Sequence, residues 1–273
     1  GLLDTRPLYT TLRRASASID GEFIGIARNL AAGRLQAVAL SALNYTTGQT
    51  VTWIQGEPLP GHHPGTVNAV PARLGVRHVM ASSALPLVFP AVRLGDAWYG
   101  DGGVRLLAPL APALHLGARR ILAISPQFRR NAPTTAPTTP GGYPPPAQIL
   151  SHMLNTVFLD VLEQDVDRLE QVSRLLCKIP SEEWGGQRPV RILVLRPSVD
   201  LGALAAEHEL RLPAAFRYLV RSLGTRETSS TDFLSYLLFE PEYLTRLIEI
   251  GERDAEARLP EIRRLLEEDD GEG

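Results

Sequence analysis

The sequence predicts an α/β fold, built as one large domain or two small ones, and three observations lead to this expectation. The 273 residues are 44% hydrophobic and 21% charged, which is typical of a globular chain that buries a core. Short apolar runs typical of buried strands alternate with segments whose apolar residues recur at helical spacing. A single cysteine, Cys177, excludes an internal disulfide and a cysteine-based zinc cage.

Charge and hydropathy argue against two further classes of protein, nucleic-acid-binding proteins and membrane-spanning proteins. Lys plus Arg number 28 and Asp plus Glu number 30, so the net charge of −2 provides no positive field for nucleic acid. We find neither a stretch of about 18 apolar residues nor a signal peptide. We therefore expect a cytoplasmic or peripherally membrane-associated protein with no nucleic-acid partner. Residue 1 is Gly and the first methionine is Met80, so we expect a piece of a longer, matured or truncated product.

The first half of the chain alternates between helical and strand patterns. Apolar spacing and end signals predict a helix that begins near Pro7 and further helices over 21–32, 75–85 and 109–116. Runs rich in β-formers predict strands over 35–43, 50–54, 92–94, 97–99 and 120–125. The first two strands are expected to form a hairpin, as are the next two, which only Gly95 and Asp96 separate. The Gly-, Pro- and His-rich segment 55–71 is predicted to be a loop.

The second half begins with a segment too polar and too interrupted to pack. Residues 126–146 hold seven prolines, and we interpret them as a mobile surface loop or lid. A long amphipathic helix is expected over 147–177, a buried strand over 189–197, and helices after 200. We therefore divide the chain into a mixed α/β portion, 1–199, and a helical extension packed on it, 200–273.

Phosphate-binding and metal-binding motifs are absent from the sequence pattern. No GxxxxGK[ST] loop occurs, and the glycines near Asp101 lack dinucleotide spacing. No two histidines stand at the i, i+4 spacing of a helical zinc site. We expect no metal and no organic cofactor, with a weak metal site at the loop residues His62 and His63 as the alternative. The other histidines are His78, His115, His152 and His208.

Asp101 is the residue that the pattern singles out for chemistry. It ends a predicted strand and is followed by Gly102 and Gly103, so its carboxylate can face a cleft while the backbone turns sharply. The alternative is an ordinary Asp-Gly turn. The residues alone leave both interpretations open.

The order of elements around Asp101 resembles the patatin-like phospholipases, a family of acyl hydrolases, and in particular its bacterial members. The segments that carry the resemblance are Ala81–Pro86 (ASSALP), Phe89–Pro90, Tyr99–Gly103 (YGDGG) and Pro109–Ala118. Further similar segments are LLDT (2–5), LNYTTGQTV (43–51) and SYLLFEPEYLTRLIEIG (235–251). The resemblance extends over nearly the whole chain and is strongest from 75 to 125.

This resemblance implies a three-layer α/β/α sandwich with a central mixed, mostly parallel sheet, here without its N-terminal elements, plus C-terminal helices. It also implies a Ser-Asp dyad in which Asp101 is the general base and Gly102 and Gly103 shape its loop. A carboxylate about 3 Å from a serine hydroxyl can take its proton directly, so no histidine is needed. Backbone N–H groups of an oxyanion loop would stabilise the developing alkoxide.

The sequence departs from the family pattern at two places. It contains neither the GxSxG nucleophile motif nor the Gly-rich oxyanion loop, and we expect both on a segment upstream of this chain. Leu106 and Leu107 stand where many members have a polar pair ending in Asn, which puts the stability of the Asp101 loop in doubt.

Four further side chains have two interpretations each. Ser82 or Ser83 could replace the missing nucleophile, although small residues in a helix that backs the site are expected to serve packing. Arg93 and Arg105 could steer an anionic headgroup, although solvated arginines are the commoner outcome.

We therefore expect a lipid acyl-ester hydrolase of the phospholipase A type whose nucleophilic serine lies upstream. Its expected partners are a lipid or other ester substrate and the upstream segment of the same precursor, with peripheral membrane contact and a homo-oligomer as further options. The alternative is a catalytically silent module that keeps the fold and binds lipid or protein.

Overall fold

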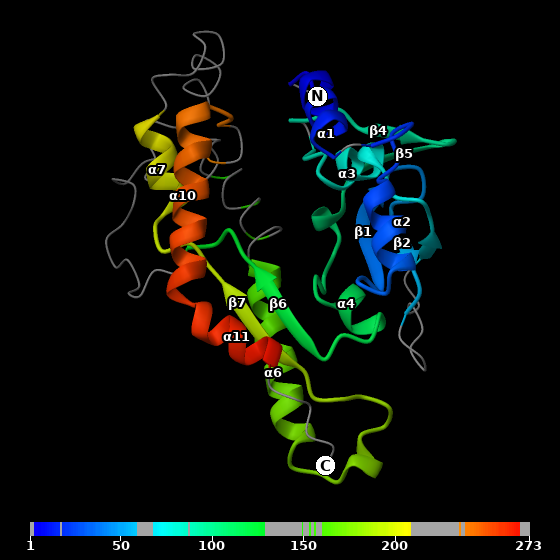
Figure 1. Ribbon diagram of the computed structural model, residues 1–273, viewed down its shortest axis with the longest axis vertical. Helices are drawn as coiled ribbons and strands as arrows, with labels where there is room; N and C mark the ends of the chain where they lie inside the picture. Colours follow the sequence, from blue (N-terminus) through cyan, green and yellow to red (C-terminus); the bar gives the residue numbers. More distant parts are fainter. Residues whose placement is uncertain are drawn as a thin grey trace. The chain divides into compact units, whose positions relative to one another are not determined.

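The computed structural model describes residues 3–16, 18–58, 68–86, 88–128, 160–208 and 238–267, together with Ile149, Met153, Thr156 and Ser235. The chain packs into two compact units, Gly1–Arg119 and Arg120–Gly273. Both units are mixed α/β (Figure 1).

The helices of the first unit lie close to where the sequence predicts them. They are α1 (Arg6–Ala15), α2 (Ile24–Ala31), α3 (Val76–Ser82) and α4 (Ala111–His115). Asp4 supports the start of α1, since its Oδ1 accepts a hydrogen bond of 3.0 Å from the Arg6 N–H. At the start of α3, the Gly75 N–H donates to His78 Nδ1 at 3.1 Å. Both contacts satisfy backbone donors that a helix start leaves unpaired.

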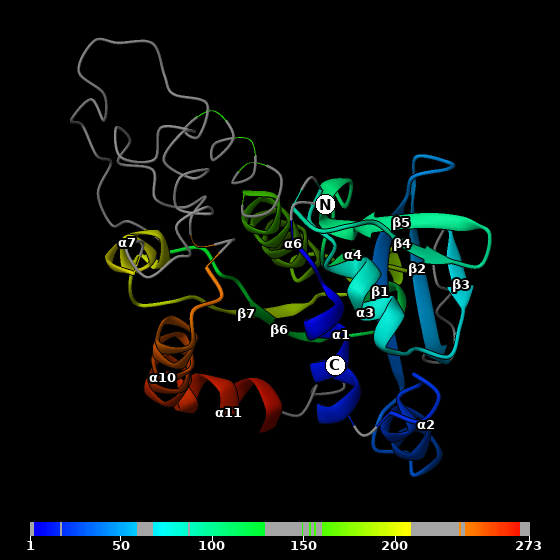
Figure 2. The same ribbon diagram turned by 90° about the horizontal axis from the view of Figure 1, so that it is seen from above.

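A five-stranded sheet forms the centre of the first unit (Figure 2). Its strands are β1 (Ala37–Asn44), β2 (Gln49–Gly56), β3 (Ala69–Pro71), β4 (Val92–Leu94) and β5 (Ala97–Asp101). Their order is β3-β2-β1-β5-β4, so β1 lies in the middle. Trp53, Leu74 and Ala81 belong to one buried cluster between the sheet and α3. This cluster fixes α3 against the strands that carry the candidate site.

The sheet is mixed, as expected, but the expectation that it is mostly parallel is wrong for the strands described. β1–β2, β1–β5 and β4–β5 are antiparallel, and only β2–β3 is parallel. Short hairpin turns join β1 to β2 and β4 to β5, so these two pairs must run antiparallel. The antiparallel β1–β5 pair joins segments far apart in the sequence and is set by tertiary packing. β3 was also missed, since its three residues lie in the Pro-rich segment that we interpreted as a loop.

The second unit contains the predicted parallel strands, β6 (Arg120–Ile124) and β7 (Arg191–Leu195), paired in register over five residues. Its other elements are α6 (Val161–Leu176), the 3₁₀ helix η3 (Ser181–Glu183), α7 (Leu201–Glu207), α10 (Pro241–Ala257) and α11 (Leu259–Glu267). α11 packs against both strands, and Arg120 Nη1 donates to the Leu266 carbonyl at 2.9 Å.

Several predictions for the second half fall outside the described residues. These are most of the Pro-rich loop 126–146, most of the first turns of the helix expected over 147–177, and residues 209–234. The helices predicted after 200 are confirmed at α7, α10 and α11. A functional division at 199/200 stays a prediction, whereas compact packing divides the chain after Arg119. Among the described residues, no helix combines the length and apolar content needed to cross a bilayer.

Candidate active site

Strand β5 ends at Asp101, and backbone contacts hold this end in place. Asp101 lies opposite Ala42 of β1, a residue with no exposed surface. Its N–H donates to the Ala84 carbonyl at 3.0 Å, which joins the segment after α3 to the strand end. A 3₁₀ turn, η1 (Gly102–Val104), begins at the next residue. Asp101 is therefore fixed between β1 and the end of α3.

The two glycines that follow have different roles in this geometry. A Cβ on Gly102 would lie 2.3 Å from the Ser41 carbonyl oxygen of β1, far inside van der Waals contact. Only glycine therefore lets the turn pass this close to β1. The Gly103 N–H donates to Asp101 Oδ1 at 2.8 Å, which fixes the orientation of the carboxylate. This is the arrangement that a loop-shaping role for Gly102 and Gly103 requires.

The Asp101 carboxyl is poised between its charged and neutral forms. Burial raises its pKa to about 6, and the hydrogen bond from the Gly103 N–H opposes this rise. Among the described residues, no cationic side chain forms an ion pair with it. A carboxylate with a pKa just below neutrality, held by one hydrogen bond, can accept a proton from a hydroxyl brought to it.

Tyr45 belongs to the same neighbourhood, and the sequence analysis missed it. Its N–H donates to the Trp98 carbonyl at 2.8 Å, and its ring lies over Gly100, where a Cβ would meet the hydroxyl at 2.3 Å. Burial, and then the negative charge of Asp101, raise the pKa of the Tyr45 phenol. The β1–β2 turn that holds Tyr45 was predicted. The Tyr45 side chain reaches β5 only because β1 and β5 pair, and this pairing was not predicted.

Arg105 connects the Asp101 turn to the β1–β2 turn. Its Nη1 donates to the Gly48 carbonyl, so its guanidinium links the turn after β5 to the β1–β2 turn. Leu107, the second of the two leucines that depart from the family pattern, is 85% exposed. It therefore does not cover the carboxylate.

The two serines at the C-terminal end of α3 donate their hydroxyl hydrogens to backbone carbonyls. Ser82 Oγ donates to the Ser41 carbonyl at 2.7 Å, and Ser83 Oγ donates to the Val79 carbonyl at 2.9 Å. Neither hydroxyl is hydrogen-bonded to Asp101 or to a histidine among the residues that the structure describes. These contacts support the packing interpretation of both serines.

The histidines are dispersed. His62, His63 and His152 lie outside the described residues, and His78 caps α3. In the second unit, His208, Glu240 and Glu242 bring potential ligand atoms within 4.8 Å of one another, a cluster that their sequence separation concealed. His208 Nδ1 is buried, has no hydrogen-bond partner among the described residues, and lies 3.8 Å from Glu240 Oε2. Glu240 Oε2 also accepts from the N–H groups of Glu242 and Tyr243, as the N-cap of α10.

Comparison with known proteins gives one match, to a family model. Residues 1–114 match the family model for the patatin-like phospholipases. Searches of curated proteins and of solved structures return no match. The family is generally hydrolytic, with esterase and phospholipase members, and the matched segment includes the whole Asp101 turn. The resemblance expected over nearly the whole chain is thus supported for residues 1–114.

Proposed function

We propose that this chain is part of a patatin-like lipid acyl hydrolase in which Asp101 is the general base of a Ser-Asp dyad. The observation that carries the proposal is the carboxyl at the end of β5, which is largely buried, has its pKa raised to about 6 and accepts a hydrogen bond from Gly103. It lies inside the segment that matches the phospholipase family. In this proposal the serine and the oxyanion loop are supplied by a segment upstream of residue 1.

The chemistry then follows from the carboxylate. The serine Oγ attacks the ester carbonyl carbon while an Asp101 carboxylate oxygen takes the Oγ proton. The bond to the alcohol breaks, and the alcohol leaves with that proton. Water then attacks the acyl-serine, Asp101 takes a proton from it, and the proton returns to the serine as the acid leaves. Because the base must be deprotonated, hydrolysis should rise as pH rises through about 6.

The experiment compares hydrolysis of p-nitrophenyl butyrate by this chain and by a longer protein that includes the upstream segment. We expect activity only in the longer protein, and we expect Asp101→Asn to lower it by about 10² to 10⁴-fold, the usual contribution of a positioned base. Asp96→Asn, in the exposed β4–β5 turn, is the matched control and should leave the rate unchanged. Activity that survives Asp101→Asn would remove Asp101 from the mechanism.

A second assay distinguishes the silent module. A fluorophosphonate probe, which labels activated serines, should leave this chain unlabelled and label the longer protein at one site. Labelling of this chain alone would show a nucleophile within it, contrary to the proposal. A longer protein that is inert in both assays but binds liposomes would favour the catalytically silent, lipid-binding module instead.

A further inference from the structure

A hollow of about 450 Å³ lies on the first unit, lined by residues of α1, α3, β4, β5 and their adjoining segments. Figure 1 shows these four elements near one another. Three of its ten lining residues are arginines, and none is acidic. Hydroxyl and apolar side chains complete the lining, among them Tyr9, Met80 and Trp98. The composition therefore combines positive charge with an apolar wall.

The arginines differ in how their charges are compensated. Arg6 forms an ion pair with Asp4, with 2.8 Å between Nη2 and Oδ2. Arg77 Nη2 donates to the Arg93 carbonyl at 2.5 Å, and Arg93 Nε donates to the Gly95 carbonyl at 3.2 Å. Neither has a carboxylate partner among the described residues. Two guanidinium groups are therefore held by neutral carbonyls and keep their full positive charge at the hollow.

We propose that this hollow binds the phosphate group of a phosphate ester through Arg77 and Arg93. A guanidinium presents five N–H donors in a planar fork that fits phosphate oxygens, and one used donor on each leaves the others available. The half-exposed Trp98 provides an apolar surface for the ester part, which inorganic phosphate would leave empty. The inference does not depend on the proposed function, because binding can be measured without turnover.

The test titrates the 273-residue chain with inorganic phosphate, glycerol 3-phosphate and dihexanoyl phosphatidic acid below its micellar concentration. Calorimetry gives each dissociation constant. We expect millimolar binding of inorganic phosphate and at least tenfold tighter binding of the short-chain lipid. Similar affinities for all three probes would show that the hollow binds only the phosphate group and not the rest of the ester. This result would still support an anion-binding site at Arg77 and Arg93. No binding of any probe at 10 mM would overturn the proposal.

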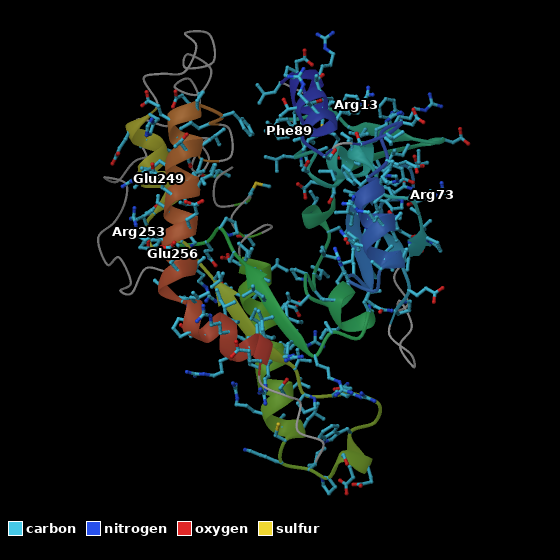
Figure 3. The ribbon with its side chains drawn as sticks, in the orientation of Figure 1. Arg13, Arg73, Phe89, Glu249, Arg253 and Glu256 are labelled. Carbon is cyan, nitrogen blue, oxygen red and sulfur yellow. The ribbon has the colours of Figure 1, made fainter. Side chains whose placement is uncertain are left out.

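Matched variants distinguish binding at this hollow from general attraction of an anion to a positively charged surface. Arg77→Gln and Arg93→Gln should each weaken binding by about tenfold, the usual effect of losing one charged hydrogen-bond donor. Arg73→Gln removes the same charge from an exposed arginine that lies outside the hollow, 3.7 Å from Glu22, and should not change it. Figure 3 labels this control position. Equal losses in all three variants would contradict the site.

Discussion

At the scale of single residues, the candidate site depends on how one carboxyl is surrounded. Asp101 has its pKa raised by burial and is not neutralised by a described cation, a combination typical of functional carboxyls. Tyr45 lies beside it and shares its electrostatic environment. Their proximity can be tested without any substrate.

The charge of Asp101 should be detectable in the titration of Tyr45. Asp101→Asn removes the negative charge that helps to raise the pKa of the Tyr45 phenol, so that pKa should fall while the part due to burial remains. The measurement is an NMR titration of the tyrosine ring signals at high pH. Tyr243, whose pKa is raised to about 12 by burial alone, is the internal control and should not change. An unchanged Tyr45 would show that the two groups are not neighbours.

The sequence identified Asp101 but not its neighbour, and the reason is physical. The strand end and the two following glycines form a local signal, readable from consecutive residues. Tyr45 reaches Gly100 only because β1 pairs with β5, and His208 meets Glu240 only because α7 and α10 pack together. A single sequence contains no local pattern that reveals contacts between segments far apart along the chain.

At the scale of elements, the hairpins were predictable and the sheet as a whole was not. Turn-forming residues at 44–49 and at Gly95 and Asp96 fix two antiparallel pairs by local chemistry. The pairing of β1 with β5 and of β2 with β3 is set by tertiary packing. The expectation of a mostly parallel sheet came from the family resemblance, and the described strands of the first unit do not follow it.

Gly102 tests whether the turn after β5 needs its close approach to β1. Gly102→Ala places a methyl group 2.3 Å from the Ser41 carbonyl oxygen, so we expect a loss of about 1 to 3 kcal/mol in the free energy of unfolding, as for other overpacked sites. Urea unfolding measures it.

The control is Gly25→Ala in α2, where a Cβ meets nothing within 4 Å. It should be neutral or stabilise the protein by up to about 1 kcal/mol, because alanine is the better helix former. Equal effects of the two substitutions would mean that Gly102 is not constrained by β1.

At the scale of the whole molecule, a raised carboxyl pKa makes stability depend on pH. The ordinary pKa of Asp is 3.8, and that of Asp101 in the folded chain is about 6, so the unfolded chain releases its proton first as pH rises. The folded state therefore loses stability between pH 4 and 6, by a total on the order of 3 kcal/mol. Side chains that lower stability are typical of sites where activity requires them.

Asp101→Asn should remove this cost. Its free energy of unfolding should exceed that of the wild type at pH 7.5, with a much smaller difference near pH 3.5, where the carboxyl is mostly protonated in both states. Chemical denaturation at the two pH values measures the difference. Asp96→Asn should show no such pH-dependent gain. If Asp101→Asn changes stability equally at both pH values, the raised pKa is refuted as its cause.

The match to a generally hydrolytic family covers residues 1–114, a segment that contains Asp101, the turn after it and the strands that hold them. The proposed hydrolase activity thus rests on whether the Asp101 carboxylate is able to act as a base near neutral pH. This property belongs to the described residues and can be measured in the 273-residue chain itself.

The most direct measurement is the titration of the Asp101 side-chain carboxyl by ¹³C NMR, with its signal assigned from its loss in Asp101→Asn. We expect a midpoint near pH 6. A midpoint near 4, the ordinary value for aspartate, would show a well-solvated carboxylate and would contradict the assignment of Asp101 as a poised general base.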